Sequence, residues 1–135
     1  MSITLTDQDK ATIRSAAYGA VSLLAAADAT GSPHKAATHG SIALSSATGV
    51  VGHVLAAKSK DITLNGKNVA ELADHVLPAL TAAMNVLQKQ DPAEADNFRN
   101  TVLVAVDAAI GSRKGAPSPV LADMTRKITA ALDAA

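Results

Sequence analysis

The chain has 135 residues, of which 48% are apolar and 18% charged, and its formal net charge is zero. This length suits a single domain spanning residues 1–135, and the apolar content argues against a disordered chain. The neutral balance also argues against nucleic-acid binding, which depends on clustered cationic charge and on aromatic stacking. Tyr18 and Phe98 are the only Tyr, Phe or Trp side chains in the sequence.

The stretch from Ala16 to Ala27 bears a superficial likeness to a secretory leader, since it is apolar and close to the N-terminus. Asp7 and Asp9 precede it where a leader carries basic residues, and Ala, Ser and Gly make it only weakly apolar. It is also too short to span a bilayer, which takes about 20 residues. We therefore expect a soluble cytoplasmic protein that does not engage a membrane. Without cysteine, the chain has no disulfide and no thiolate metal ligand.

The first helix is predicted to run from about Asp7 to Ala29. Thr6 is a suitable N-cap, and acidic residues at positions 7 and 9 favour the positive end of the helix dipole. Apolar residues then recur every three or four positions, and the segment Thr30-Gly31-Ser32 ends the helix.

Ser32 and Pro33 predict the start of a second helix, with a cap followed by proline at the first helical position. Its apolar stripe continues to Val54 and passes Gly49 and Gly52, each of which costs about 1 kcal/mol inside a helix. Two explanations remain open: a close helix crossing that needs small residues, or fraying of the helix after Ala47. The continuing stripe favours the crossing.

A loop is expected from Lys58 to Lys67, and Asn68 then caps a third helix that extends to about Leu87. Glu71 stands at the capping-box position of this helix. Pro78 falls in its interior and removes a backbone hydrogen bond, which predicts a kink.

Asp91 and Pro92 repeat the signal of a cap followed by proline, and predict a fourth helix that ends near Gly111. After a loop, Ser118 and Pro119 open a last helix. No segment alternates apolar and polar residues for long enough to predict a strand. The prediction is an all-α fold, a bundle of five helices.

The sequence contains a weak internal similarity at an offset of 59 residues (62 minus 3), which pairs Ile3-Thr4-Leu5 with Ile62-Thr63-Leu64. It suggests two repeated helical hairpins, at about 3–52 and 62–111, followed by a C-terminal helix. Further identities at this offset involve Ala11, Ala20, Pro33, Ala36, Leu44 and Gly52. Duplication is one explanation; the other is that any two alanine-rich hairpins with proline starts align in this way.

Catalytic and metal-binding motifs are missing from the sequence. The four histidines, at positions 34, 39, 53 and 75, include no pair with the i, i+4 spacing of a helical zinc site. Glu71 and His75 have that spacing, but the chain has only one other glutamate, too few for a di-iron bundle. No Gly-x-Ser-x-Gly elbow or phosphate-binding loop occurs. We therefore predict no metal, no cofactor and no catalytic residue, and lean against an enzyme.

One helix start differs from the others. The second helix begins with Pro33, His34 and Lys35 and has no acidic residue, although free backbone N–H groups and cations there suit a bound anion. The hypothesis is an anion or ligand site formed by Ser32, His34, Lys35 and His39. The alternative is that exposed cations are simply tolerated there.

The core is predicted to contain few large side chains. About 30 residues are alanine, and a buried alanine contributes much less to stability than a leucine or phenylalanine. We therefore expect a homo-oligomer, most simply a homodimer. It would act as a protein-interaction or scaffold module, and another protein could also be its partner. The alternative is a regulatory bundle that binds a small molecule or anion, with an apolar cavity near Tyr18 and Phe98.

Overall fold

The computed structural model describes residues 4–27, 33–56, 68–111 and 119–135. These ranges contain helices and no strand, which confirms the predicted all-α fold. The expected loops at 58–67 and 115–118, and the predicted end of the first helix at Ala29, lie outside the described residues. The helices are α1 (Asp7–Ala27), α2 (Pro33–Ser45), α3 (Gly49–Ala56), α4 (Val69–Gln90), α5 (Pro92–Gly111) and α6 (Pro119–Asp133).

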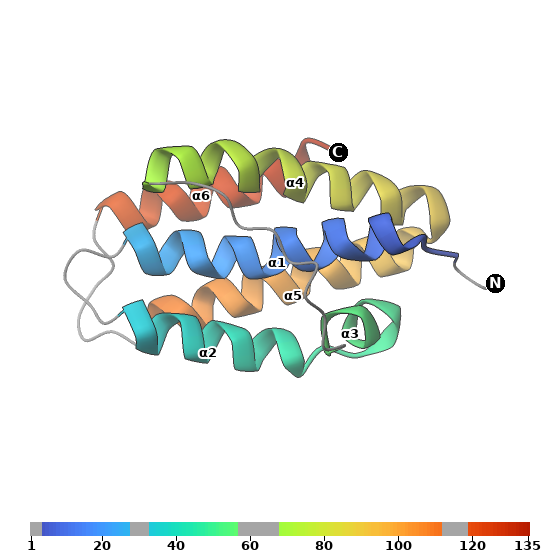
Figure 1. The fold of residues 1–135 in the computed structure, drawn as a ribbon, viewed down its shortest axis with the longest axis horizontal. Helices are drawn as coiled ribbons and strands as arrows, with labels where there is room; N and C mark the ends of the chain where they lie inside the picture. The colour runs from blue at the N-terminus through green and yellow to red at the C-terminus, as the bar shows by residue number, and fades with distance from the viewer. Residues whose placement is uncertain (1–3, 28–32, 57–67, 112–118) are drawn as a thin grey trace.

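The helices form an elongated bundle in which α1 is central (Figure 1). In the view of Figure 1, α1 lies between α4 and α2, with α5 and α6 behind them. The most extensive packing joins α1 to α4 and α2 to α5. Buried residues lie on most sides of α1, as expected for a helix that is surrounded by others.

The core combines a few large side chains with many small ones. Alanines on α1, including Ala16, Ala17 and Ala20, are fully buried and let neighbouring backbones approach closely. The large, fully buried side chains come from all six helices and include Phe98, Ile13, Leu24, Leu44, Leu55, Leu80, Leu121 and Ile128.

A close helix crossing occurs between α1 and α2, at Gly40. A Cβ atom added at Gly40 would lie 2.6 Å from Cγ1 of Val21, which is closer than real Cβ contacts allow. Val21 is buried and β-branched, so its side chain has little freedom to move aside. Glycine at this position therefore permits the contact between the two helices.

The predicted second helix is two helices, so the count of five is corrected to six in the described ranges. The chain leaves α2 after Ser45 and starts α3 at Gly49, whose φ of 74° is a left-handed conformation suited to glycine. A Cβ atom at Gly52 would collide with the backbone carbonyl of Ala47. The two glycines thus allow a sharp turn between α2 and α3. Neither of the two expected explanations, a close helix crossing or fraying of one continuous helix, applies to them.

Helix starts agree with the prediction. The Thr6 hydroxyl accepts a hydrogen bond from the Asp9 backbone N–H at 3.0 Å, and the Asn68 side chain accepts one from the Glu71 N–H at 2.9 Å. Prolines are the first residues of α2, α5 and α6. Helix α4 continues through Pro78, and the kink at that residue stays a prediction. No helix in the described ranges has the length and apolar character needed to cross a membrane.

Candidate functional site

The site is arranged around α3, a helix of eight residues. Helices this short are unstable alone in water, so α3 depends on neighbouring elements. At its N-terminus, the Glu94 carboxylate of α5 accepts a hydrogen bond from the Val50 backbone N–H at 2.6 Å. Asn97 donates both to Glu94 (3.2 Å) and to the Thr48 carbonyl (2.8 Å). A negative charge therefore caps the positive end of the α3 dipole.

The other end of α3 is held by two side chains of α1. The Arg14 guanidinium donates to the Val54 carbonyl at 3.4 Å, and the Tyr18 hydroxyl donates to the Leu55 carbonyl at 2.9 Å. These donors are four residues apart on α1 and so share one face. Arg14 is only 6% exposed, which places its positive charge near the negative end of α3 with little solvent between them. Helix α3 is thus fixed between α5 and α1.

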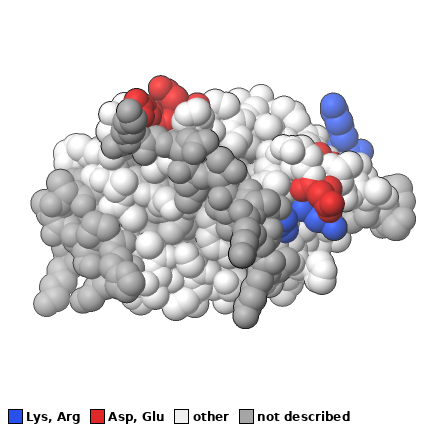
Figure 2. Space-filling view, viewed as in Figure 1, with Lys and Arg blue, Asp and Glu red and all other residues white. Residues whose placement is uncertain are grey.

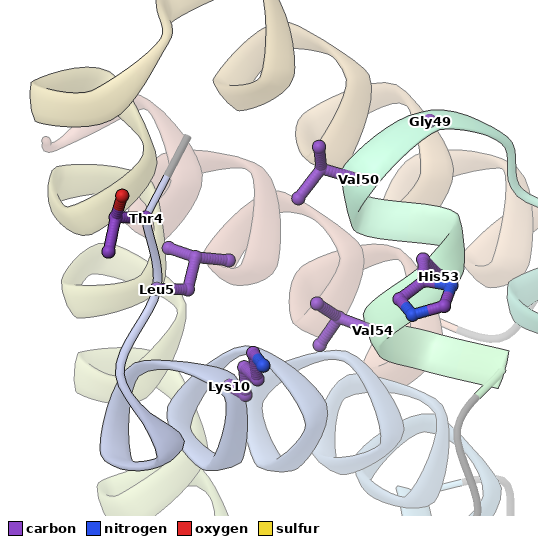
Figure 3. A pocket seen from close by; sticks show the side chains of 7 residues that line it. All are labelled: Thr4, Leu5, Lys10, Gly49, Val50, His53 and Val54. Carbon is purple, nitrogen blue, oxygen red and sulfur yellow. The ribbon is translucent and has the colours of Figure 1, made fainter. Parts of the chain in front are cut away.

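A groove lies between α3, the start of α1 and the segment that precedes α1 (Figure 3). Its volume is about 640 Å³, within the range of pockets that hold small molecules. Leu5, Val50 and Val54 supply its apolar surface, as Figure 3 shows. The remaining lining residues are Thr4, Lys10, Gly49 and His53.

The polar side chains of the groove include two nitrogen-bearing groups, while the Glu94 carboxylate bonds the backbone of the lining residue Val50. Lys10 and His53 line it, and no aspartate or glutamate does. Within the described part of the chain, no ion pair or hydrogen bond engages the Lys10 ammonium group or the His53 ring. Both groups are therefore available to a ligand.

A second surface without charge covers α2 and the adjoining part of α5. Ile42 and Val104 are each 59% exposed on it, although branched apolar side chains are usually buried. Two shallow hollows share Ser46 and join these residues into one surface. We call it the α2–α5 face; it comprises Ala37, Thr38, Ser41, Ile42, Ala43, Ser45, Ser46, Ala47, Thr48, Asn97, Asn100, Thr101 and Val104. None of them is charged, and the surface over α2 is white in Figure 2.

The residues of the hypothetical anion site are only partly described. His34 and Lys35 belong to the first turn of α2, as expected, but their side chains and Ser32 lie outside the described part of the structure. His39 is exposed on α2. Most of this set therefore lies outside the described part of the structure, and the hypothesis stays a prediction.

Sequence reasoning missed the groove because its residues come from separate segments. In the sequence, Lys10 has no feature that sets it apart, and His53 has no histidine partner at i, i+4 spacing. The two aromatic residues, expected beside a cavity, have other roles: Phe98 is fully buried in the core and Tyr18 caps α3. In the described ranges, no three histidine, aspartate or glutamate side chains are grouped so that they could hold a metal ion.

Comparisons with protein-family models, with curated proteins and with solved structures found no match to this chain. The function is therefore inferred from the groove and the α2–α5 face.

Proposed function

We propose that the protein is a small interaction or scaffold module that forms a homodimer through the α2–α5 face. The observation that carries the proposal is a surface without charged residues that exposes two branched apolar side chains, Ile42 and Val104. Exposed apolar patches of this kind mark interaction sites, and charged residues are depleted at the centre of interfaces.

The energetics favour a second copy of the chain as the partner. Fully burying an Ile or Val side chain contributes about 1.5–3 kcal/mol, and a twofold interface buries each residue twice. A formal net charge of zero means that two copies do not repel each other over long distances. A standard interface takes about 800 Å² from each partner, on the order of a tenth of the 7078 Å² accessible surface.

The test compares two variants with a matched control. Ile42→Glu and Val104→Glu each place a charge on the α2–α5 face, whereas Val120→Glu does so on α6, where Val120 is 55% exposed. We expect the wild type and Val120→Glu to be dimers by light scattering after size-exclusion chromatography, and the two face variants to be monomers. A monomeric wild type from micromolar to millimolar concentration would refute the proposal.

The anion site at Ser32, His34, Lys35 and His39 is the second candidate function. Its support is that α2 has no acidic residue in its first turn, a property that it shares with α3 and α6 and that therefore does not set it apart, contrary to the sequence-based expectation. Titration with phosphate, followed through the ring resonances of His34 and His39, tests it; unchanged shifts at millimolar phosphate would exclude the site.

Internal duplication and a cytoplasmic location also remain proposals. Duplication is supported by the packing of corresponding helices, α1 on α4 and α2 on α5. The symmetry is not complete in the described residues, because α1 also packs on α5 whereas α2 does not pack on α4. Relatives whose sequences lack the similarity at an offset of 59 residues would count against duplication. The location is supported by the sequence alone, and cell fractionation would test it.

A further inference from the structure

We infer that the groove beside α3 is a binding site for a small amphipathic carboxylate, a monocarboxylic acid with a hydrocarbon part. This site is separate from the α2–α5 face, and its occupancy does not depend on self-association.

The apolar part of the groove fits a hydrocarbon chain. Leu5 comes from the segment before α1, and Val50 and Val54 come from one side of α3, so these side chains converge from two elements (Figure 3). Val54 is nearly fully buried, whereas Leu5 and Val50 are half-buried and retain apolar surface for a ligand. Covering that surface favours binding roughly in proportion to the area removed from water.

The polar part of the groove fits a single negative charge. Lys10, on α1, offers an ammonium group with three donors, and His53, on α3, offers a ring N–H. The acid that caps the same helix, Glu94, does not line the groove, and its carboxylate is already bonded to Val50 and Asn97. A carboxylate has two acceptor oxygens, so one ammonium group and one ring N–H can bind it.

The groove is also organised before a ligand arrives. Glu94 fixes one end of α3, and Arg14 and Tyr18 fix the other, and none of these three residues lines the groove. The α3 residues of the groove are therefore held in place without a ligand. Binding then does not have to order α3, which lowers its entropic cost.

The test uses octanoate, with acetate and octan-1-ol as matched probes that lack the hydrocarbon part and the charge, respectively. Each is titrated into the 135-residue chain while NMR follows the methyl groups of Leu5, Val50 and Val54 and the ring of His53. We expect octanoate to shift these signals in a saturable manner, at a concentration about tenfold lower than either control probe needs. Shifts caused equally by octan-1-ol would reduce the site to a nonspecific apolar surface and overturn the inference.

Variants then test whether the charge of Lys10 contributes to octanoate binding. Lys10→Gln should weaken octanoate binding about fivefold and leave octan-1-ol binding unchanged, because only the charge is removed. Lys127→Gln, on α6 outside the groove, is the matched control and should bind octanoate normally. Ile42→Glu should also bind normally, which distinguishes this site from the proposed dimer. Unchanged octanoate affinity in Lys10→Gln, or no shift at millimolar octanoate, would refute the inference.

Discussion

Helix α3 and the α5–α6 pair are stabilised in opposite ways. Helix α3 has eight residues, and side chains from other helices hold both of its ends. Helices α5 and α6 are 20 and 15 residues long, and they bury large side chains such as Phe98 and Ile128. The ion pair that joins them, between Arg99 and Asp133 at 2.8 Å, is largely exposed to solvent.

The difference shows where polar interactions matter in this molecule. Glu94 and Tyr18 bond backbone groups at the ends of a short helix, in partly buried positions, where an unsatisfied group costs about 1–3 kcal/mol. The exposed pair between α5 and α6 competes with water and salt, so it adds little to helices that the core already holds. Three predictions test this contrast, in order of decreasing effect.

The largest effect is expected for Gly52→Ala in α3. The new methyl group would collide with the Ala47 carbonyl, which is backbone and cannot simply rotate away. We expect a loss of about 2–4 kcal/mol in the free energy of unfolding, measured by urea denaturation. Gly111→Ala in α5 is the control, because nothing lies within 4 Å of the added Cβ. Similar losses in both variants would show that α3 has no special steric constraint.

An intermediate effect is expected for Glu94→Ala. The substitution removes the acceptor of the Val50 N–H and the charge at the start of α3, which should cost about 1–2 kcal/mol. Asp96→Ala, an exposed acid on the same helix, should change stability by less than about 0.5 kcal/mol. Amide exchange should accelerate in α3 of the Glu94 variant and remain slow in α6; uniform acceleration would contradict the assigned capping role.

The smallest effect concerns Asp133 and pH. The hydrogen bond from Arg99, together with its charge, holds the pKa of Asp133 below its ordinary value. The interaction therefore stabilises the fold above the ordinary carboxylate pKa of about 3.9, and this contribution is lost as pH falls through the lowered pKa. Asp133→Asn should flatten the acid limb of the stability curve slightly and speed amide exchange only in the last turn of α6.

A control within α6 sharpens this test. Asp123 also has a lowered pKa, caused first by its hydrogen bonds from Arg126 and Lys127, but these partners lie on its own helix. Asp123→Asn should therefore leave amide exchange at the contact between α5 and α6 unchanged. A large change in global stability for either variant would mean that exposed pairs contribute more than we argue.

The sequence was informative where a structural cause is local. Thr6 and Asn68 cap helices through residues three positions away, and the prolines of α2, α5 and α6 start helices through their own fixed φ. The stripes of apolar residues likewise predicted most of the buried faces. Such signals need no knowledge of the rest of the chain.

The break between α2 and α3 and the groove were missed because their causes are distant in sequence. Val51 and Val54 continue the three- and four-residue spacing of α2, so the pattern looks unbroken although the chain turns. The contacts that hold the turn come from Glu94 and Asn97 on α5. Likewise, Lys10 and His53 share the groove only because α3 folds back against α1.

Gly40 affects the packing of α2 on α1 because it has no Cβ atom. It contributes almost no apolar area, yet the bulk of Val21 opposite it sets how near α2 can come to α1. Alanine there would act as a spacer and lift α2, together with Ile42, away from the rest of the bundle. The shape of the molecule's outer surface on that side is therefore governed by a residue that contributes nothing to the surface itself.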